Sequence, residues 1–215
     1  LEAQFTSGAG NWCTWMFGRD LVNWNNNFTW AKWVTPSRDL ISAFKQEGDE
    51  VRFKESIVYY DCNWSNYYPS DNYPFMYKCR SANSSIIKYR YADVLLLKAE
   101  ALIMQDTPDL EGAADIIDEV RDRAKLGALP TSVRSNKNVL LNALLKERRL
   151  ELAFEGQRWF DLVRLDKVEE VMNAVYSKDS GRKAQIYTFD KNSYRLPIPQ
   201  SVIDANDKIH QNPGY

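Results

Sequence analysis

YADVLLLKAEALIM, at residues 91–104, is the stretch of sequence that decides the fold. Its apolar residues recur every three or four positions, which predicts an α-helix. Thr107 and Pro108 fit an N-cap and a first helical position, so we expect a second helix from there to about Leu126, with Gly127 as its left-handed stop. Because the connection is short, the two helices are predicted to form an antiparallel hairpin. The second-helix residues expected to face the first are Ala113, Ile116, Ile117, Val120 and Ala124.

A second helical hairpin is predicted after a polar loop at residues 131–138. Its helices are expected at about Val139–Phe154 and Gln157–Tyr176, the latter broken near Asp166. Small residues at close-packing positions make the two hairpins resemble degenerate tetratricopeptide repeats. Two repeats are fewer than the three usually needed, so we expect them to pack on another part of the protein. That part is either the aromatic region before residue 89 or an N-terminal portion that this chain lacks.

Aromatic residues are concentrated in residues 1–88, which hold 18 of the 28 Trp, Tyr and Phe side chains. Periodicity is poor in this region, and Asn, Gly, Pro and Ser are scattered between the aromatic residues. Leu1–Phe5 and Val51–Tyr60 are predicted strands, the second one preceded by turn-like residues at 47–50. The remainder of the region is predicted to be loops.

The last part of the chain, residues 177–215, is polar and rich in turn residues, with one predicted strand at Gln185–Phe189. Pro197 and Pro199 force extended backbone. We therefore expect a C-terminal strap along the surface of the helices. The predicted fold is mainly α, with tetratricopeptide-like helical hairpins at 89–176, an irregular loop-rich subdomain with a few short strands at 1–88, and the strap at 177–215.

Composition excludes several classes of protein. A net charge of −1 removes the electrostatic drive toward nucleic acid, which is therefore not an expected partner. No run approaches the roughly 18 apolar residues that a membrane-spanning helix needs. Cys13, Cys62 and Cys79 are too few for a disulfide framework, and free thiols are favoured over the one bridge they could form.

Catalytic and metal-binding residues are sparse. The one histidine, His210, lies in the polar C-terminal tail, where a catalytic triad would be hard to assemble. Transition-metal sites need clustered His or Cys, and the sequence offers none, so we expect no cofactor. A structural calcium ion on side chains such as Asp71 and Asn72 stays open.

Acidic and basic residues alternate at helical spacing between residues 147 and 164. The series is Glu147, Arg148, Glu151, Glu155, Arg158, Asp161 and Arg164. Two such carboxylates could serve a polysaccharide hydrolase. The spacing of three or four, as in Glu155 with Arg158 and Asp161 with Arg164, instead favours an ion-pair network that joins the third and fourth helices. We therefore assign no catalytic residue and predict that the protein is not an enzyme.

Four motifs extend from residue 90 to the last residue. They are RYADVLLLKAEA at 90–101, KERRLELAFEGQRWFDL at 146–162, LPIPQ at 196–200 and QNPGY at 211–215. In this order they make the chain resemble the C-terminal portion of the SusD/RagB family of Bacteroidetes. The Leu1–Phe5 strand fits the same pattern less specifically.

The resemblance implies an outer-membrane nutrient-binding lipoprotein with a tetratricopeptide-like superhelix. Such proteins lie on the cell surface as a lid on a TonB-dependent, SusC-like transporter and capture glycans, or in some branches peptides, for import. The chain begins at Leu1 without Met, signal peptide or the lipidated cysteine of the family. We therefore expect membrane association only through a lipid anchor that lies outside this segment.

Aromatic side chains beside amides suit sugar binding, because a flat ring covers the C–H face of a sugar while polar groups bind its hydroxyls. The expected ligand-binding residues are Trp12, Trp24, Asn63, Trp64, Asn66, Tyr67 and Tyr68. An aromatic core is the alternative role for any one of them. The resemblance favours a glycan that is bound without chemistry, with peptide capture and a polysaccharide hydrolase as the alternatives.

Overall fold

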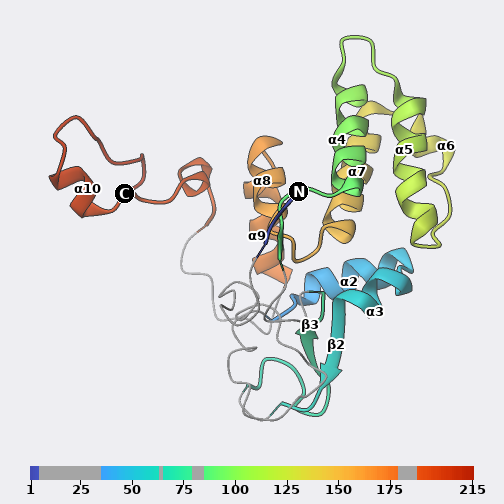
Figure 1. Cartoon of the computed structure of the whole chain (residues 1–215), viewed down its shortest axis with the longest axis horizontal. Coiled ribbons are helices and arrows are strands. Elements are labelled where there is room, and N and C mark those ends of the chain that lie inside the picture. Colours follow the sequence, from blue (N-terminus) through green and yellow to red (C-terminus); the bar gives the residue numbers. More distant parts are fainter. Residues whose placement is uncertain (5–34, 63–64, 79–84, 179–187) are drawn as a thin grey trace. The chain divides into compact units, whose positions relative to one another are not determined.

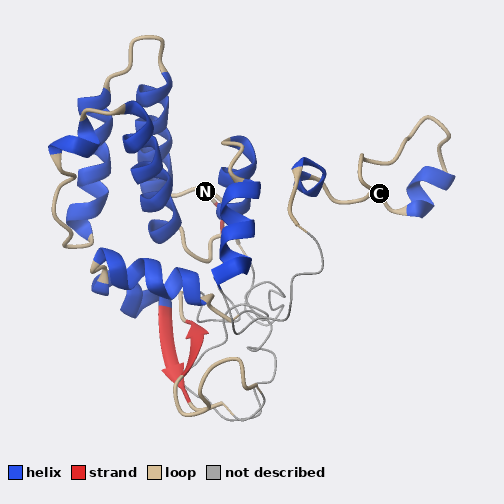
Figure 2. Cartoon of the chain, turned by 180° about the vertical axis from the view of Figure 1, so that it is seen from behind, coloured by secondary structure: helices blue, strands red, loops and turns tan. Residues whose placement is uncertain are grey.

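The computed structural model describes residues 1–4, 35–62, 65–78, 85–178 and 188–215, which form two compact units, Leu1–Arg158 and Trp159–Tyr215 (Figure 1). Helices dominate both units, and strands are confined to short stretches (Figure 2). The prediction of a mainly α fold with a few short strands is therefore confirmed. The division into three sequence regions stays a prediction.

Helices α4 (Tyr91–Met104) and α5 (Leu110–Arg123) form the expected antiparallel hairpin. Helix α7 (Lys137–Glu151) packs across both of them, and the short α6 (Thr131–Arg134) lies in the segment predicted as a loop. Small side chains let the helices approach closely. The fully buried core of the three helices contains Leu96, Ala99, Ile103, Ala113, Ala114, Ile117, Leu140 and Leu144.

The boundaries of α5 differ from the prediction at both ends. Its N-cap is Asp109, not Thr107, because the Asp109 carboxylate accepts a hydrogen bond from the backbone N–H of Gly112 at 2.9 Å. After its last turn the left-handed residue is Lys125, with φ of 59°, and not Gly127. Because Lys125 has a Cβ atom, it adopts the αL conformation at a cost that glycine would avoid.

The predicted strand Val51–Tyr60 is wrong over its first half. Gly48, with φ of 70°, ends helix α2 (Arg38–Glu47), and Asp49 caps the next helix, α3 (Glu50–Ser56), by accepting from the Arg52 N–H at 3.1 Å. Only the β-branched and aromatic end forms strand β2 (Ile57–Tyr60). Helix α2 itself was predicted as a loop.

Two short antiparallel sheets accompany these helices. Strand β2 pairs with β3 (Tyr73–Met76), with Ile57 opposite Met76 and Tyr60 opposite Tyr73. The N-terminal strand β1 (Glu2–Ala3) is shorter than predicted and pairs with β4 (Ile86–Ile87).

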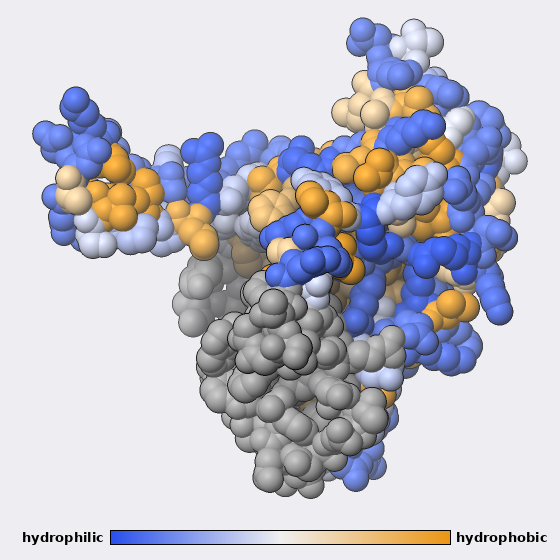
Figure 3. Space-filling model, viewed as in Figure 1, coloured by the Kyte–Doolittle hydropathy of each residue, from blue (hydrophilic) through white to orange (hydrophobic). Residues whose placement is uncertain are grey.

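The region before residue 89 provides a packing partner for the helices α4, α5 and α7 of the first unit. Ile41 and Phe44 of α2 lie in one buried cluster with Leu150 and Ala153, at the end of α7. Helix α4 also carries exposed apolar side chains. Tyr91 is 72% exposed and Met104 is 53% exposed, and Figure 3 shows hydrophobic surface among hydrophilic side chains over the α4–α5 region.

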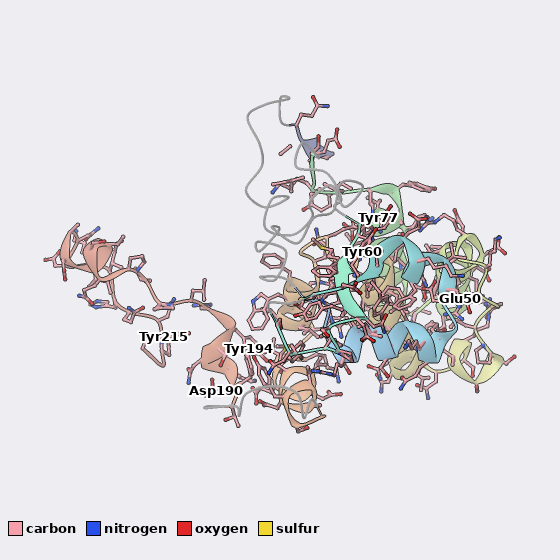
Figure 4. The ribbon with its side chains drawn as sticks, turned by 90° about the horizontal axis from the view of Figure 1, so that it is seen from below. Glu50, Tyr60, Tyr77, Asp190, Tyr194 and Tyr215 are labelled. Carbon is pink, nitrogen blue, oxygen red and sulfur yellow. The ribbon has the colours of Figure 1, made fainter. Side chains whose placement is uncertain are left out.

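In the second unit, α8 (Arg158–Arg164) and α9 (Val168–Lys178) meet at Asp166, which has φ of 54°. The expected break near this residue is confirmed. The 3-10 helix η3 (Lys191–Tyr194) follows, capped by Asp190, and α10 (Gln200–Asp204) lies near the C-terminus. Figure 4 labels Asp190 and Tyr194 at the two ends of η3. Most of the predicted strand Gln185–Phe189 lies outside the described residues, and the docking of the strap on the helices stays a prediction.

The last two sequence motifs bind each other. Ile198 lies between two prolines, which have no N–H of their own. Its backbone N–H donates to the Gln211 side-chain oxygen at 2.8 Å, and the Gln211 side-chain amide donates to the Ile198 carbonyl at 2.9 Å. The Asn212 amide donates to the Leu196 carbonyl at 2.7 Å, and the Tyr215 hydroxyl donates to the Arg195 carbonyl at 3.1 Å. Side chains thus provide hydrogen-bond partners for the polar groups of this extended backbone, which belongs to neither a helix nor a sheet.

Buried carboxylates on α7 connect the elements of the first unit. Glu147 pairs with Arg52 of α3 at 2.6 Å and with Arg121 of α5 at 3.3 Å. Glu151 pairs with Arg52 at 3.0 Å, with Arg90 at the start of α4 at 2.6 Å, and with Arg123 of α5. Both carboxylates are 2% exposed. These pairs run from α7 to α3, α4 and α5, and a connection from the charged run to the following helix stays a prediction.

Burial and the neighbouring Arg side chains shift the pKa values of Glu147 and Glu151 in opposite directions. Burial works to raise the pKa of Glu151, but the guanidinium groups of Arg90, Arg52 and Arg123 outweigh it and hold that pKa below its usual range. At Glu147 burial prevails over Arg52 and Arg121 and raises the pKa. Within α8, Asp161 pairs with Arg164 at 2.8 Å, as predicted.

Replacing Glu151 with Gln is expected to destabilise the chain by about 3 kcal/mol, because the buried Arg52 and the partly buried Arg90 would each lose one of their counter-charges. Urea unfolding followed by circular dichroism measures the change. Glu119→Gln, on the exposed side of α5, is the control and is expected to change the free energy of unfolding by less than about 0.5 kcal/mol. Equal stability of the two variants would contradict the proposed importance of the network.

Replacing Gln211 with Ala is expected to expose the Ile198 N–H to solvent. Hydrogen exchange at that amide should become roughly fivefold faster, which is the effect of losing a hydrogen bond of about 1 kcal/mol. Gln105→Ala, at an exposed position after α4, is the control. Unchanged exchange at Ile198 would show that the Gln211 side chain does not hold this backbone.

Candidate functional site

An open cleft of about 450 Å³ lies between α2 and the segment that connects β2 to β3. One wall is a face of α2, and the other is formed by β2 and the residues that follow it. The described residues that line it are Arg38, Ile41, Ser42, Lys45, Gln46, Tyr59, Tyr68, Pro69 and Asn72. The lining combines aromatic rings with amide, hydroxyl and cationic groups, which is the chemistry expected of a sugar-binding surface.

The α2 wall results from the helical spacing of its residues. Arg38, Ile41, Ser42 and Lys45 are three or four positions apart and therefore share one side of the helix. Ser37 fixes the start of this helix, because its hydroxyl accepts a hydrogen bond from the Leu40 N–H at 3.1 Å.

Tyr68 is the most firmly positioned aromatic ring of the cleft. Its hydroxyl donates to the Pro36 carbonyl at 2.7 Å, which ties the β2–β3 connection to the segment before α2. Its ring lies edge-to-face with those of Tyr67 and Tyr73, at centroid distances of 5.0 and 5.5 Å. A ring held from three sides loses little conformational entropy when a ligand packs on it.

Arg38 connects the two walls. Its guanidinium carbon lies 4.0 Å from the ring centroid of Tyr67 and 4.5 Å from that of Tyr68, and its Nη2 donates to the Tyr67 carbonyl. Such cation–π contacts add to the rigidity of the aromatic pair.

Tyr59 is half-buried on β2, where its ring packs at 6.3 Å from that of Phe53. Burial raises the pKa of the Tyr59 phenol further above physiological pH. Its neutral hydroxyl can both donate and accept hydrogen bonds. Asn72 lies at the rim of the cleft and is exposed.

The structure brings part of the predicted ligand-binding set together. Tyr68 lines the cleft and Tyr67 lies directly behind it, whereas Asn66 is exposed and does not line it. Trp12, Trp24, Asn63 and Trp64 lie outside the described residues, so their role stays a prediction.

Sequence reasoning missed the α2 wall with Arg38 and Lys45. The signal was present, because Ser37 and Gly48 are an N-cap and a left-handed stop on either side of the apolar residues Leu40, Ile41 and Phe44. Loops are predicted for the part of the aromatic region between its two predicted strands, and this helix was therefore missed.

Other candidate chemistry in the described residues is limited. No group of three or more His, Cys, Asp or Glu there is placed to hold a metal ion. His210 is exposed, and Cys62 is a buried free thiol, while Cys13 and Cys79 lie outside the described ranges. The carboxylates of the charged run are occupied by Arg side chains. The calcium ion proposed near Asp71 stays a prediction.

A sequence model of the SusD family matches residues 70–215. The chain belongs to the SusD family. SusD-like protein P38 of Formosa agariphila is 43% identical over 99 residues, which are 43% of this chain and 19% of that protein.

Solved structures agree with this fold. A SusD superfamily protein from Parabacteroides distasonis has a TM-score of 0.70 at 21% identity, covering 100% of this chain and 49% of the other. A laminarin-binding SusD-like protein has a TM-score of 0.58 at 27% identity, covering 84% of this chain and 38% of the other. The chain thus spans half or less of the length of these SusD-family proteins.

Replacing Tyr68 with Phe is expected to lower the free energy of unfolding by about 1 kcal/mol, because the Pro36 carbonyl loses its donor. Thermal or urea unfolding measures this loss. Tyr91→Phe is the matched control, because Tyr91 is 72% exposed. The same stability in both variants would mean that the hydroxyl does not anchor the cleft.

Proposed function

We propose that the chain binds an oligo- or polysaccharide in the cleft between α2 and the β2–β3 connection and performs no chemistry on it. The observation that supports this most is the placement of Tyr59 and Tyr68 in one cleft with the polar side chains of Ser42, Gln46 and Asn72. Aromatic rings cover the apolar face of a sugar, and the amides and hydroxyls bind its hydroxyl groups. Trp12, Trp24, Asn63 and Trp64 are proposed as further ligand contacts.

The laminarin-binding relative supports a glycan as the ligand. Membership of the SusD family supports a place at the surface of the bacterial outer membrane, held there by a lipid anchor. It also supports delivery of the ligand to a TonB-dependent, SusC-like transporter. Among the described helices, none is long and apolar enough to cross a bilayer.

The buried ion pairs argue against a hydrolase built on the charged run. Glu147 and Glu151 are 2% exposed, and each is held by Arg side chains. A hydrolase needs two carboxyl groups on opposite sides of an accessible glycosidic bond. For a protein that binds a sugar without chemistry, the free energy of binding comes from ring contacts and hydrogen bonds and is partly offset by desolvation of the sugar.

Binding is tested by titrating a panel of plant, algal and microbial oligosaccharides into the chain in a calorimeter. Tyr68→Ala is expected to weaken binding of any oligosaccharide that the chain retains by about tenfold or more, since it removes the central ring of the cleft. Tyr91→Ala, on the exposed side of α4, is the control and is expected to bind as the unmodified chain does.

Three results would overturn the proposal. One is retention of peptides with no retention of saccharides, which would favour the peptide-binding branch of the family. Another is product release from an oligosaccharide, lost on substitution of an Asp or Glu, which would show an enzyme. The third is equal binding by the Tyr68→Ala and Tyr91→Ala variants, which would place the site elsewhere.

A further inference from the structure

Positive charge is the second chemical property of the cleft. Arg38 and Lys45 both line it, whereas no Asp or Glu is among its described lining residues. The two cations are seven residues apart on α2, which places them roughly 10 Å apart along the helix axis. An oligosaccharide of a few units can therefore meet both.

The carboxylates nearest in sequence are bound by other cations. Asp39 pairs with Arg149, and Glu47 pairs with Arg121 at 2.7 Å and with Lys146. Burial alone would raise the pKa of Glu47, but the hydrogen bonds from Lys146 and Arg121 outweigh it and lower that pKa.

The same is true at the start of α3. Asp49 pairs with the buried Arg52 at 2.5 Å, and Glu50 pairs with Lys54 at 2.9 Å. These four carboxylates thus pair with cations that do not line the cleft, and the two charged side chains among its described lining residues are both positive.

We propose that the ligand of this cleft is an acidic saccharide, bearing carboxylate or sulfate groups, whose anionic group binds at Lys45 while its ring packs on Tyr59 and Tyr68. The proposal rests on the proposed function and deepens it. Lys45 is exposed at the rim, so its ammonium can reach an anionic group without the loss of a buried contact. Arg38 lies over the Tyr67 and Tyr68 rings, about two helical turns from Lys45, and is the second cationic side chain of the lining.

The test compares acidic saccharides with neutral forms of the same backbone. Calorimetric titrations use tetragalacturonate against its methyl ester, and a sulfated galactan oligosaccharide against its desulfated form. The acidic member of at least one pair is expected to bind at least fivefold more tightly at 50 mM NaCl, and raising the salt to 300 mM should reduce that preference. Preference within the first pair or the second distinguishes uronate from sulfate recognition.

A matched pair of variants locates the effect. Lys45→Met is expected to weaken binding of the acidic member about fivefold, or ~1 kcal/mol, and to leave the neutral member within twofold. Lys98→Met, which removes an exposed charge from α4, is the control and should change neither.

Tighter binding of the neutral member, or an equal effect of Lys45→Met on both members, would overturn this inference while leaving glycan binding intact. If neither these probes nor any other saccharide of the panel bound, both the inference and the proposed function would fail. Loss of binding in Lys98→Met as well would show that the preference follows net charge and not the cleft.

Discussion

The burial of two glutamates on α7 is the constraint on which the first unit depends. Glu147 and Glu151 are almost inaccessible to water, and removing a carboxylate from water is costly unless cations and hydrogen bonds replace the solvent. The replacements come from α3, α5 and the start of α4, through Arg52, Arg121 and Arg90. These helices must therefore approach α7 at specific positions, which apolar packing alone would not define as sharply.

The same constraint positions the cleft. The ion pair between Arg52 and Glu151 holds α3 against α7, and the turn at Gly48 joins α3 directly to α2. On α2, Glu47 is bound by Arg121 and Lys146, so one side of the helix faces the scaffold. The side with Arg38 and Lys45 is thereby turned toward Tyr59 and Tyr68. The cleft residues, which come from a region of poor periodicity, obtain a fixed geometry from the helices that they pack against.

The sequence predicts the helices better than it predicts the site. Helix α4 was predicted at its observed bounds because its apolar pattern is continuous, and the break at Asp166 was predicted as well. Helix α3 was predicted as a strand, because its formation depends on the Asp49 cap and on the distant partners of Arg52. Local periodicity does not contain that information. Tyr68 was predicted from its neighbours, but the approach of Arg38, 30 residues earlier, is a property of the folded chain.

The residues that stabilise the fold and the residues that line the cleft lie largely in different parts of the sequence. Arg90, Glu151 and Gln211 lie in the motifs that carry the family resemblance, and they form ion pairs and backbone hydrogen bonds. The family match begins at residue 70, after Arg38 through Pro69, which form nearly all of the cleft lining. The groups that stabilise the scaffold are thus largely distinct from the groups available to a ligand. A change of charge or ring in the cleft can therefore alter the chemistry that the cleft offers to a ligand, at little cost to the ion pairs that hold the helices.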